Sequence, residues 1–465
     1  MTSIWSKRNL TVLGRITILK SLILPIFNYY ILTLPSPADT YIKHIDSLFY
    51  QFIWKNKPDR VRRNLIIRNY SDGGLKMIDV STHVVALKTT CIARLLSDNN
   101  DNNGITSFYI RSWNVSIDDF FVNGDYYIRL VSQRVTNTFW KDVFNAAYYF
   151  LCKYSYPVSL TEGNMILNQP IWNNSLILVD NGPVCYPHWK RKGVIFVNDL
   201  LEQDGSFLTF DRFIDIFHIA TNFLEYYGII AAIKSTWRRF LINLGHKLDN
   251  PINSFVNIIL CNDSLKCRSI YDKIINSRDT DNKTFLKWSE TINISENSWS
   301  LYCSIPFRCT SDVQMRWFQY RLINIIIPTN KYLMIINVSD SNRCTFCDVE
   351  VETIQHLFYD CHFTNQLWRY LHNIFHSKDI RVDLQDVRTV LFGGDFSREL
   401  NLIIVLVKYF IFRSKLVKRY PTTVLLLQYL REYFEMYYYI FRTNMKVNIW
   451  ERYWRPWVNV LALGI

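Results

Sequence analysis

The sequence predicts a mainly α-helical, multi-domain fold with small β hairpins. Apolar residues recur at three- and four-residue spacing in many parts of the chain, whereas strand-like runs are short. The length of 465 residues allows about three domains. Aromatic residues make up 16% of the chain and only 14 residues are glycine, so long disordered or low-complexity regions are not expected.

The first predicted segment, residues 1–96, is helical and contains a basic hairpin. Ser36 is expected to cap a helix that has Pro37 at its first position. Apolar residues then follow at helical spacing and form one buried stripe: Ile42, Ile45, Leu48, Phe49, Phe52 and Ile53. The stretch Lys55–Val80 has two short apolar runs on either side of a Ser-Asp-Gly-Gly turn, which predicts the hairpin. A further helix is expected over Asp79–Leu96.

The second predicted segment, residues 97–300, is a connecting helical region. It begins with a polar linker at Ser97–Gly104. Helical spacing starts at Phe139 and again at Thr209, which is a suitable N-cap. The remainder is expected to mix short helices and loops.

A cluster of cysteine and histidine characterises the third predicted segment, residues 301–376. Its spacing is C-x2-C-x8-H-x4-C, and its members are Cys344, Cys347, His356 and Cys361. Three thiolates and one imidazole form a tetrahedral zinc set, and four protein ligands leave no position for water, so such a site is structural. The other interpretation is four buried but unlinked side chains, since free cysteine packs as a small hydrophobe. The sequence favours zinc and adds a Cys3His zinc-binding module to the predicted fold.

Helices are expected on the C-terminal side of this cluster. Apolar residues from Phe363 to Phe375 repeat every three or four residues. The fourth predicted segment, residues 377–465, is a basic helical tail, in which two long helices are expected over Asn401–Ile465 with an interruption at Pro421.

The positive charge of the chain is concentrated in two regions. Residues 1–76 have 12 Lys and Arg against 4 Asp and Glu, a net charge of +8, and residues 402–465 have 10 against 3, a net charge of +7. The residues between them carry a net charge of −2. Clustered basic regions are typical of proteins that bind a polyanion, although solubility alone explains any single charge. We therefore expect nucleic acid as a partner.

Secretion and membrane insertion are not expected. Arg15 and Lys20 interrupt the first apolar stretch, which argues against a cleavable signal peptide. The uninterrupted part, Ser21–Leu34, is too short to span a bilayer. A zinc-type cysteine pattern without a secretory signal indicates a reducing compartment, the nucleus or the cytoplasm.

Five stretches, taken in order, resemble the C-terminal part of the reverse transcriptase protein of LINE-type non-LTR retrotransposons. They are LTVLGRITILKSLILPIFNY from Leu10, SLFYQFIWKNKPDRVRRNLIIRNYSDGGLKMIDV from Ser47, HWKRKGVIFVNDLL from His188, MRWFQYRLINIIIPTNKYLMI from Met315 with CTFC and ETIQHLFYDC after it, and LFGG and NLIIVLVKYFIFRSK from Leu391. In that family these stretches are part of the thumb, the connecting region and the zinc-binding module. The order of the five matches makes the resemblance specific.

The resemblance implies a non-catalytic portion that holds RNA and target DNA during target-primed reverse transcription. Phosphate contacts would come from two basic groups, Lys55, Lys57, Arg60, Arg62, Arg63 and Arg68, and Arg413, Lys415, Lys418 and Arg419. Three tryptophans of the tail, Trp450, Trp454 and Trp457, could stack on single-stranded bases, although packing between helices explains them slightly better. The alternative function is a zinc-stabilised helical scaffold that binds proteins and no nucleic acid.

Enzyme activity is not expected. In the family the endonuclease and the polymerase palm precede the thumb, and this chain resembles the family from the thumb onward. The single pair of adjacent aspartates, Asp118 and Asp119, has Ser116 where a polymerase hairpin carries an aromatic residue. No phosphate-binding loop, zinc-protease motif or nucleophile elbow is present, and no small-molecule substrate is expected.

Overall fold

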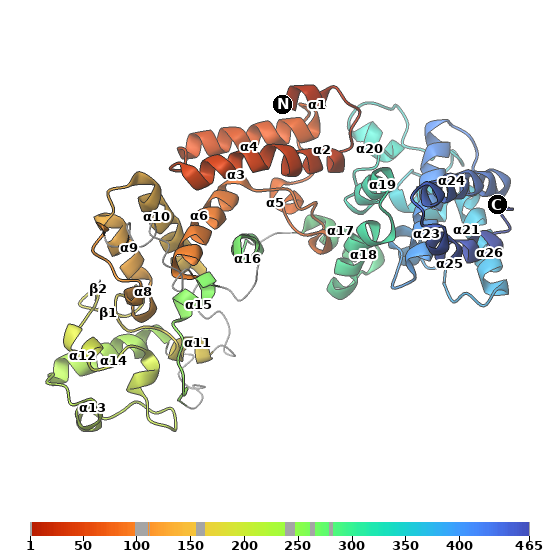
Figure 1. The fold of residues 1–465 in the computed structure, drawn as a ribbon. Helices are drawn as coiled ribbons and strands as arrows, with labels where there is room; N and C mark the ends of the chain where they lie inside the picture. The colour runs from red at the N-terminus through yellow and green to blue at the C-terminus, as the bar shows by residue number, and fades with distance from the viewer. Residues whose placement is uncertain are drawn as a thin grey trace. The chain divides into compact units, whose positions relative to one another are not determined.

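The computed structural model describes residues 2–97, 110, 112–154, 163–237, 247–260, 266–278 and 282–464, and within this part of the chain helices predominate (Figure 1). A small antiparallel pair is formed by β1 (Leu178–Val179) and β2 (Gly182–Pro183). Asp180 and Asn181 join the two strands with φ of 51° and 63°, as a two-residue hairpin turn requires. The mainly α fold with minor strands is confirmed. Apart from Ser97, the predicted linker Ser97–Gly104 lies outside the described residues.

The chain divides into two packing units. Unit 1 consists of Met1–Leu19, Phe49–Met77 and Thr280–Ile465, and unit 2 consists of Lys20–Leu48 and Ile78–Asp279. Two helices, η1 (Leu19–Ile23) and α4 (Asp39–Trp54), contribute residues to both units. These units describe packing, and the four segments of the sequence analysis stay a prediction.

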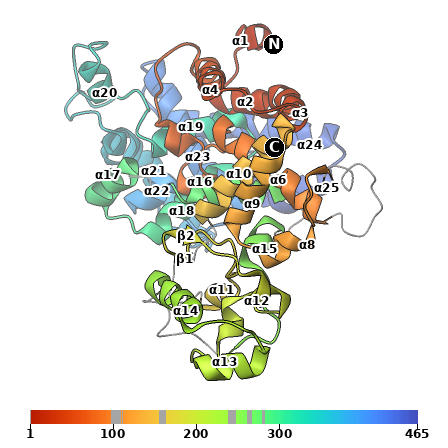
Figure 2. The same cartoon turned by 90° about the vertical axis from the view of Figure 1, so that its left-hand side faces the viewer.

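Unit 2 has two apolar cores. Around the first, α6 (Val80–Ser97) and α9 (Asp125–Arg134) both pack against α10 (Thr138–Tyr154), as Figures 1 and 2 show. The same unit contains α3 (Leu24–Thr33), α8 (Asp118–Val122), α15 (Ser254–Leu260) and α16 (Lys266–Asn276). The second core is surrounded by β1, β2, α11 (Gly163–Leu167), α12 (Pro187–Arg191), η3 (Val197–Leu200), α13 (Phe210–Phe217) and α14 (Phe223–Trp237). The predicted cap Thr209 is confirmed, because its side chain accepts a hydrogen bond from the backbone N–H of Arg212.

A buried histidine distinguishes the first part of unit 2. His83 is 8% exposed, and its Nε2 lies 2.7 Å from Oδ1 of Asn28. Burial lowers the pKa of His83 to about 4, because the charged imidazolium is poorly solvated there. His83 is therefore neutral in the folded chain near neutral pH.

Unit 1 is organised around α23 (Arg398–Leu416), which is buried on nearly all sides. This helix packs against α18 (Glu296–Cys309), α19 (Val313–Ile323), α24 (Thr423–Thr443) and η5 (His356–Asp360). The remaining elements are α1 (Thr2–Ser6), α2 (Val12–Ile18), α5 (Arg63–Ile66), η2 (Tyr70–Asp72), α17 (Lys283–Ile292), α20 (Asn330–Ile335), α21 (His362–Ser377), α22 (Val387–Phe392), α25 (Val447–Tyr453) and α26 (Arg455–Val460). Four helices, α23 to α26, thus occupy the region Asn401–Ile465, where two were predicted.

The predicted basic hairpin is wrong. Arg63–Ile66 is one helical turn and Tyr70–Asp72 is a 3-10 turn, although the chain does reverse and the backbone N–H groups of Leu75 and Met77 both donate to the carbonyl of Ile66 (2.9 and 3.0 Å). Ile66 and its neighbour Ile67 are both buried, whereas in a hairpin with one solvent-facing side successive side chains would alternate between a covered and an exposed face. Gly74 is required for the reversal, since a Cβ there would lie 2.1 Å from the carbonyl oxygen of Arg68.

The first helices of the chain also differ from expectation. α4 begins at Asp39, and Ser36 does not cap it, because the backbone N–H and the hydroxyl of Ser36 both donate to the carboxylate of Asp142 (2.9 and 2.6 Å). The stretch Val12–Thr33 is long and apolar enough to cross a membrane by length and composition only, with a mean hydropathy of 1.5. Core helices of soluble proteins meet the same criterion, so this observation carries no assignment.

Candidate metal centre

The four predicted ligands converge on one point of unit 1. The ligand atoms of Cys344, Cys347, His356 and Cys361 all lie within 4.8 Å of one another. The sulfurs of Cys344 and Cys361 are 3.9 Å apart, and Sγ of Cys347 is 3.4 Å from Nε2 of His356. The Cys3His group of the predicted fold is therefore confirmed.

These separations match the edges of a zinc tetrahedron. Bonds of ~2.3 Å to sulfur and ~2.05 Å to nitrogen at tetrahedral angles give a sulfur–sulfur edge of about 3.8 Å and a sulfur–nitrogen edge of about 3.6 Å. Both observed distances lie within about 0.2 Å of these values. The group fits Zn²⁺ with four protein ligands and no open position, which is the geometry of a structural site.

A tight turn positions the first two cysteines. Arg343 and Val351 form an antiparallel bridge, and the backbone N–H of Cys344 donates to the carbonyl of Glu350 (2.8 Å). Between them the N–H of Asp348 donates back to the carbonyl of Cys344 (3.0 Å), with Asp348 in the left-handed region at φ 53°. The chain therefore reverses within a few residues and both sulfurs point inward.

A π-helical turn positions the other two ligands. His356 begins η5, and the backbone N–H of Cys361 donates to the carbonyl of His356 (2.9 Å), a hydrogen bond between residues five apart. An α-helix would turn five residues through about 500° and separate the two side chains by roughly 140°. The π turn, a form often found at functional sites, lets ligands at this spacing face the same point. The N–H of His356 donates to Oγ1 of Thr353 (3.0 Å), which fixes the start of the turn.

A hydrogen bond connects the two buried cysteines. The thiol of Cys344 donates to the sulfur of Cys361, and this hydrogen bond lowers the pKa of Cys361. Backbone N–H groups of Phe363 and Thr364 at the start of α21 act in the same direction. The hydrogen bond and burial both raise the pKa of Cys344. Zinc would displace the thiol protons, because its cysteine ligands are thiolates.

The centre is continuous with the core of unit 1. Cys344 and Cys361 are each 1% exposed and belong to the same apolar cluster as α23. The indole N–H of Trp368 on α21 donates to the carbonyl of Phe358 in η5 (2.7 Å). Metal binding at this position therefore stabilises the packing of η5 and α21 as well as the turn itself.

A buried carboxylate, which the sequence analysis did not identify, supports the cysteine turn. Glu352 is fully buried, and its carboxylate accepts hydrogen bonds from the backbone N–H of Asn330 (2.7 Å) and from the N–H and hydroxyl of Thr345 (2.8 and 2.7 Å). The ammonium group of Lys415 on α23 donates to the same carboxylate at 2.6 Å. This network connects the turn that carries Cys344 to α20 and to α23. No periodicity or motif marks Glu352, because its burial depends on residues far away in the chain.

The ten cations of the predicted nucleic-acid contacts all belong to unit 1. Eight of them are exposed: Lys55, Lys57, Arg60, Arg62, Arg63, Arg413, Lys418 and Arg419. Arg68 is partly buried. Lys415 has a side chain that is only 6% exposed and is paired with Glu352, so it does not belong with the exposed cations. For the other nine, contact with nucleic acid stays a prediction.

Two further predicted features have structural explanations. Trp450 and Trp454 are 0% and 2% exposed, so they are packed between helices, and Trp457 is partly buried. Asp118 and Asp119 lie in the first turn of α8, and the carboxylate of Asp119 pairs with Lys190 at 2.9 Å. The aspartate pair therefore lies at a helix start.

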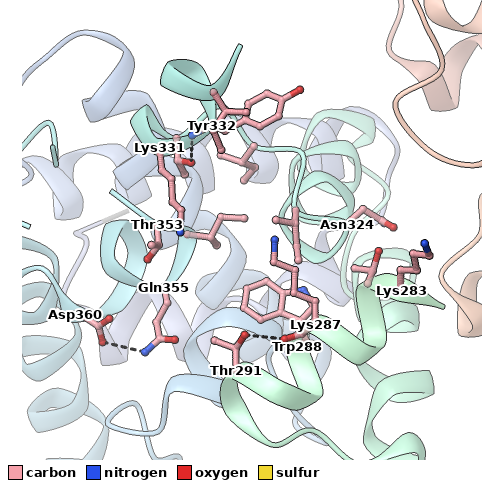
Figure 3. A pocket seen from close by; sticks show the side chains of 16 residues that line it. Lys283, Lys287, Trp288, Thr291, Asn324, Lys331, Tyr332, Thr353, Gln355 and Asp360 are labelled. Carbon is pink, nitrogen blue, oxygen red and sulfur yellow. Dashed lines mark hydrogen bonds between the residues drawn. The ribbon is translucent and has the colours of Figure 1, made fainter. Parts of the chain in front are cut away.

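A cavity of about 660 Å³ lies beside the metal centre. It is lined by α17, by α20 and by the segment that leads into and through η5, and Lys283, Lys287 and Lys331 all reach it (Figure 3). Its indole, Trp288, is 4% exposed and donates to the carbonyl of Ile323 (2.8 Å). The carboxylate of Asp360 faces Gln355, whose amide donates to it (3.4 Å, Figure 3). The buried indole donor of this cavity is therefore already satisfied.

Comparison with known proteins identifies the type of module. No curated protein matches the chain. Residues 266–368 match the family described as zinc-binding in reverse transcriptase, and this range contains all four ligands. This part of the chain is therefore a zinc-binding module of the type associated with reverse transcriptases.

Proposed function

We propose that this chain is a non-catalytic, nucleic-acid-binding portion of a non-LTR retrotransposon reverse transcriptase, with RNA and DNA as its partners. The match of residues 266–368 to a reverse-transcriptase-associated zinc family supports the protein class. The Cys3His centre supports a structural role for zinc, which would hold the binding surface in shape.

The observation that carries the proposal is a basic loop in the same packing unit as the metal centre. Residues 55–63 contain five cations and a single acid, Asp59. Asp59 pairs with Arg63 at 2.7 Å, and the loop keeps a net positive charge on an exposed surface. Such a surface attracts phosphates because binding releases the counterions condensed on nucleic acid.

A binding role without catalysis is favoured by the surroundings of the aspartates. Polymerases hold two divalent metals about 4 Å apart on paired carboxylates. Asp119 is instead engaged by Lys190 and by the hydroxyl of Tyr127 (3.3 Å). We therefore expect no nucleotide incorporation by this chain, and a primer-extension signal that disappears in Asp118→Asn would contradict that expectation.

Filter binding tests the proposal directly. Labelled RNA and single-stranded DNA are titrated with the zinc-loaded chain at two salt concentrations. We expect retention of both probes. The logarithm of the affinity should fall linearly with the logarithm of the salt concentration, with a slope of roughly −0.7 for each phosphate contacted. No retention at low salt would contradict the proposal and favour the zinc-stabilised protein scaffold. That scaffold would use exposed apolar residues such as Val424 and Tyr439 of α24, which are 73% and 66% exposed.

A further inference from the structure

A second cavity of unit 1, of about 360 Å³, lies at the end of α4 and is strongly basic. It is also lined by the start of α2 and by α19. Four cations line it, Lys55, Lys57, Arg60 and Arg321, and its lining includes neither aspartate nor glutamate. We call this space the basic cavity.

Little within the described residues neutralises these cations. The nearby carboxylate of Asp59 is paired with Arg63 and does not line the cavity. The ammonium group of Lys55 donates only to the amide oxygen of Asn9 (3.5 Å). Burial lowers the pKa of Arg321, and the positive charge of Arg60 acts in the same direction. Like charges that converge without an acid are unfavourable unless an anion is bound between them.

Two residues that line the cavity each carry a buried N–H donor without an acceptor. Trp54 is 5% exposed, and neither its Nε1 nor the Nε of Arg321 has a hydrogen-bond partner among the described residues. Burying such a donor without a partner costs free energy, and most buried polar groups in folded proteins are satisfied. The cavity beside the metal centre differs, because the indole N–H of Trp288 reaches the carbonyl of Ile323. The donors at Trp54 and Arg321 therefore indicate a missing acceptor.

The missing acceptor has a defined chemistry. It carries negative charge, because four cations surround it, and it offers oxygen atoms to N–H donors of an indole and a guanidinium group. A phosphate group satisfies both conditions, because it is negatively charged and its oxygens accept hydrogen bonds from arginine and from other N–H donors. The exposed cations Lys57 and Arg60 at the same cavity leave it accessible to a chain that continues on either side.

We propose that the basic cavity seats one backbone phosphate of a bound nucleic-acid strand, with Trp54 and Arg321 as its buried donors and Lys55, Lys57 and Arg60 around it. This inference rests on the proposed nucleic-acid binding and assigns it a specific position. The rest of the basic loop then contacts neighbouring phosphates.

A pair of tryptophan variants tests the position with opposite expected results. Trp54→Phe removes a donor that has no partner in the free chain, so we expect stability to fall only by the packing lost with the smaller ring, and binding of a single-stranded oligonucleotide to weaken about tenfold. Trp288→Phe removes a donor that is already bonded to Ile323, so we expect lower stability and unchanged binding. Fluorescence anisotropy measures the affinity, and chemical denaturation measures the stability.

An arginine pair provides the second comparison. Arg321→Gln should weaken binding by about tenfold or more, whereas Arg381→Gln, the same change at an exposed position outside the cavity, should leave the affinity nearly unchanged. Pyrophosphate is then titrated as a competitor for the cavity. It should displace the oligonucleotide from the wild-type chain, because both ligands offer phosphate oxygens to the same donors. It should not displace the oligonucleotide from Trp54→Phe.

The outcomes separate this inference from the proposed function. The proposed phosphate position would be wrong if the wild-type chain bound nucleic acid and all four variants, Trp54→Phe, Arg321→Gln and the two controls, bound it equally well. The proposed nucleic-acid binding would then still hold. Absence of binding by the wild-type chain would overturn both. In that case, a rise in melting temperature with pyrophosphate that is lost in Trp54→Phe would identify a site for free phosphates instead.

Discussion

The metal centre and the basic cavity both gather polar groups within unit 1, but they satisfy them in different ways. Beneath the cysteine turn of the metal centre, buried hydrogen-bond donors find acceptors within the chain. For example, the single carboxylate of Glu352 accepts hydrogen bonds from Asn330, Thr345 and Lys415. At the basic cavity cations and N–H donors accumulate without acceptors. A site that is internally complete stabilises a fold, whereas a site with unmatched donors is suited to recognise a ligand.

The largest effect is expected from removing a zinc ligand. Cys344→Ser should abolish binding of about one zinc per chain and lower the free energy of unfolding by on the order of 5 kcal/mol, because metal binding contributes directly to folding. Elemental analysis and chemical denaturation measure the two quantities.

Cys185→Ser is the matched control for this change. Cys185 is exposed and belongs to unit 2, so its replacement should leave both zinc content and stability unchanged. A Cys344→Ser protein that kept its zinc and its stability would show that the four side chains are merely packed together.

The next largest effect is expected at the buried pair beneath the cysteine turn. Glu352→Gln leaves the ammonium group of Lys415 buried without its counter-charge, which should cost about 3–5 kcal/mol. Because Glu352 also holds the N–H of Thr345, zinc affinity should fall by about tenfold. Competition with a chelator measures the affinity.

A double variant distinguishes charge from packing at this pair. Replacing Lys415 by Met together with Glu352→Gln removes the uncompensated charge and should restore much of the lost stability. An equal loss in the single and double variants would mean that hydrogen bonding to the turn, and not the ion pair, stabilises this region.

A smaller effect, dependent on pH, is expected in unit 2, which contains neither site. The pKa of His83 is lowered to about 4 in the folded chain from 6.5, so below pH 6.5 the unfolded chain takes up a proton that the folded chain does not. Proton uptake linked to His83 should therefore lower the free energy of unfolding of the wild-type chain by about 3 kcal/mol as the pH falls from 6.5 to about 4. His83→Gln should lack this contribution. Denaturation curves of both proteins at several pH values give the difference, which is independent of acid-induced zinc release because both proteins carry the same metal centre.

The smallest effect is expected from a single exposed cation. Lys57→Gln should weaken nucleic-acid binding only a few-fold and reduce the slope of log affinity against log salt by about 1, without changing stability. Lys378→Gln, an equally exposed lysine outside the basic loop, should change neither quantity. Identical salt slopes for Lys57→Gln and the wild-type chain would show that this part of the loop does not contact phosphate.

The sequence predicted best where a local pattern determines the outcome. Helical spacing identified α6 and α10, and the cysteine and histidine spacing identified the metal centre, because those features depend on residues close together in the chain. Prediction failed at Lys55–Val80, where burial of both Ile66 and Ile67 requires tertiary contacts. It failed for Lys415 for the same reason, since its partner Glu352 lies 63 residues earlier. Trp54 and Arg321 were missed because the absence of a partner is visible only in three dimensions.

The discontinuity of unit 1 has a consequence for biosynthesis. A nascent chain that has emerged from the ribosome as far as Asp279 contains every residue of unit 2, but only the two short N-terminal stretches of unit 1. Those stretches, which include α2 and the basic loop, cannot bury their apolar residues until α19 and α23 have been translated. We therefore expect a premature stop codon before Arg398 to leave α2 and the basic loop unfolded while unit 2 still folds, so that these two stretches are protected from proteases only after α19 and α23 have been made.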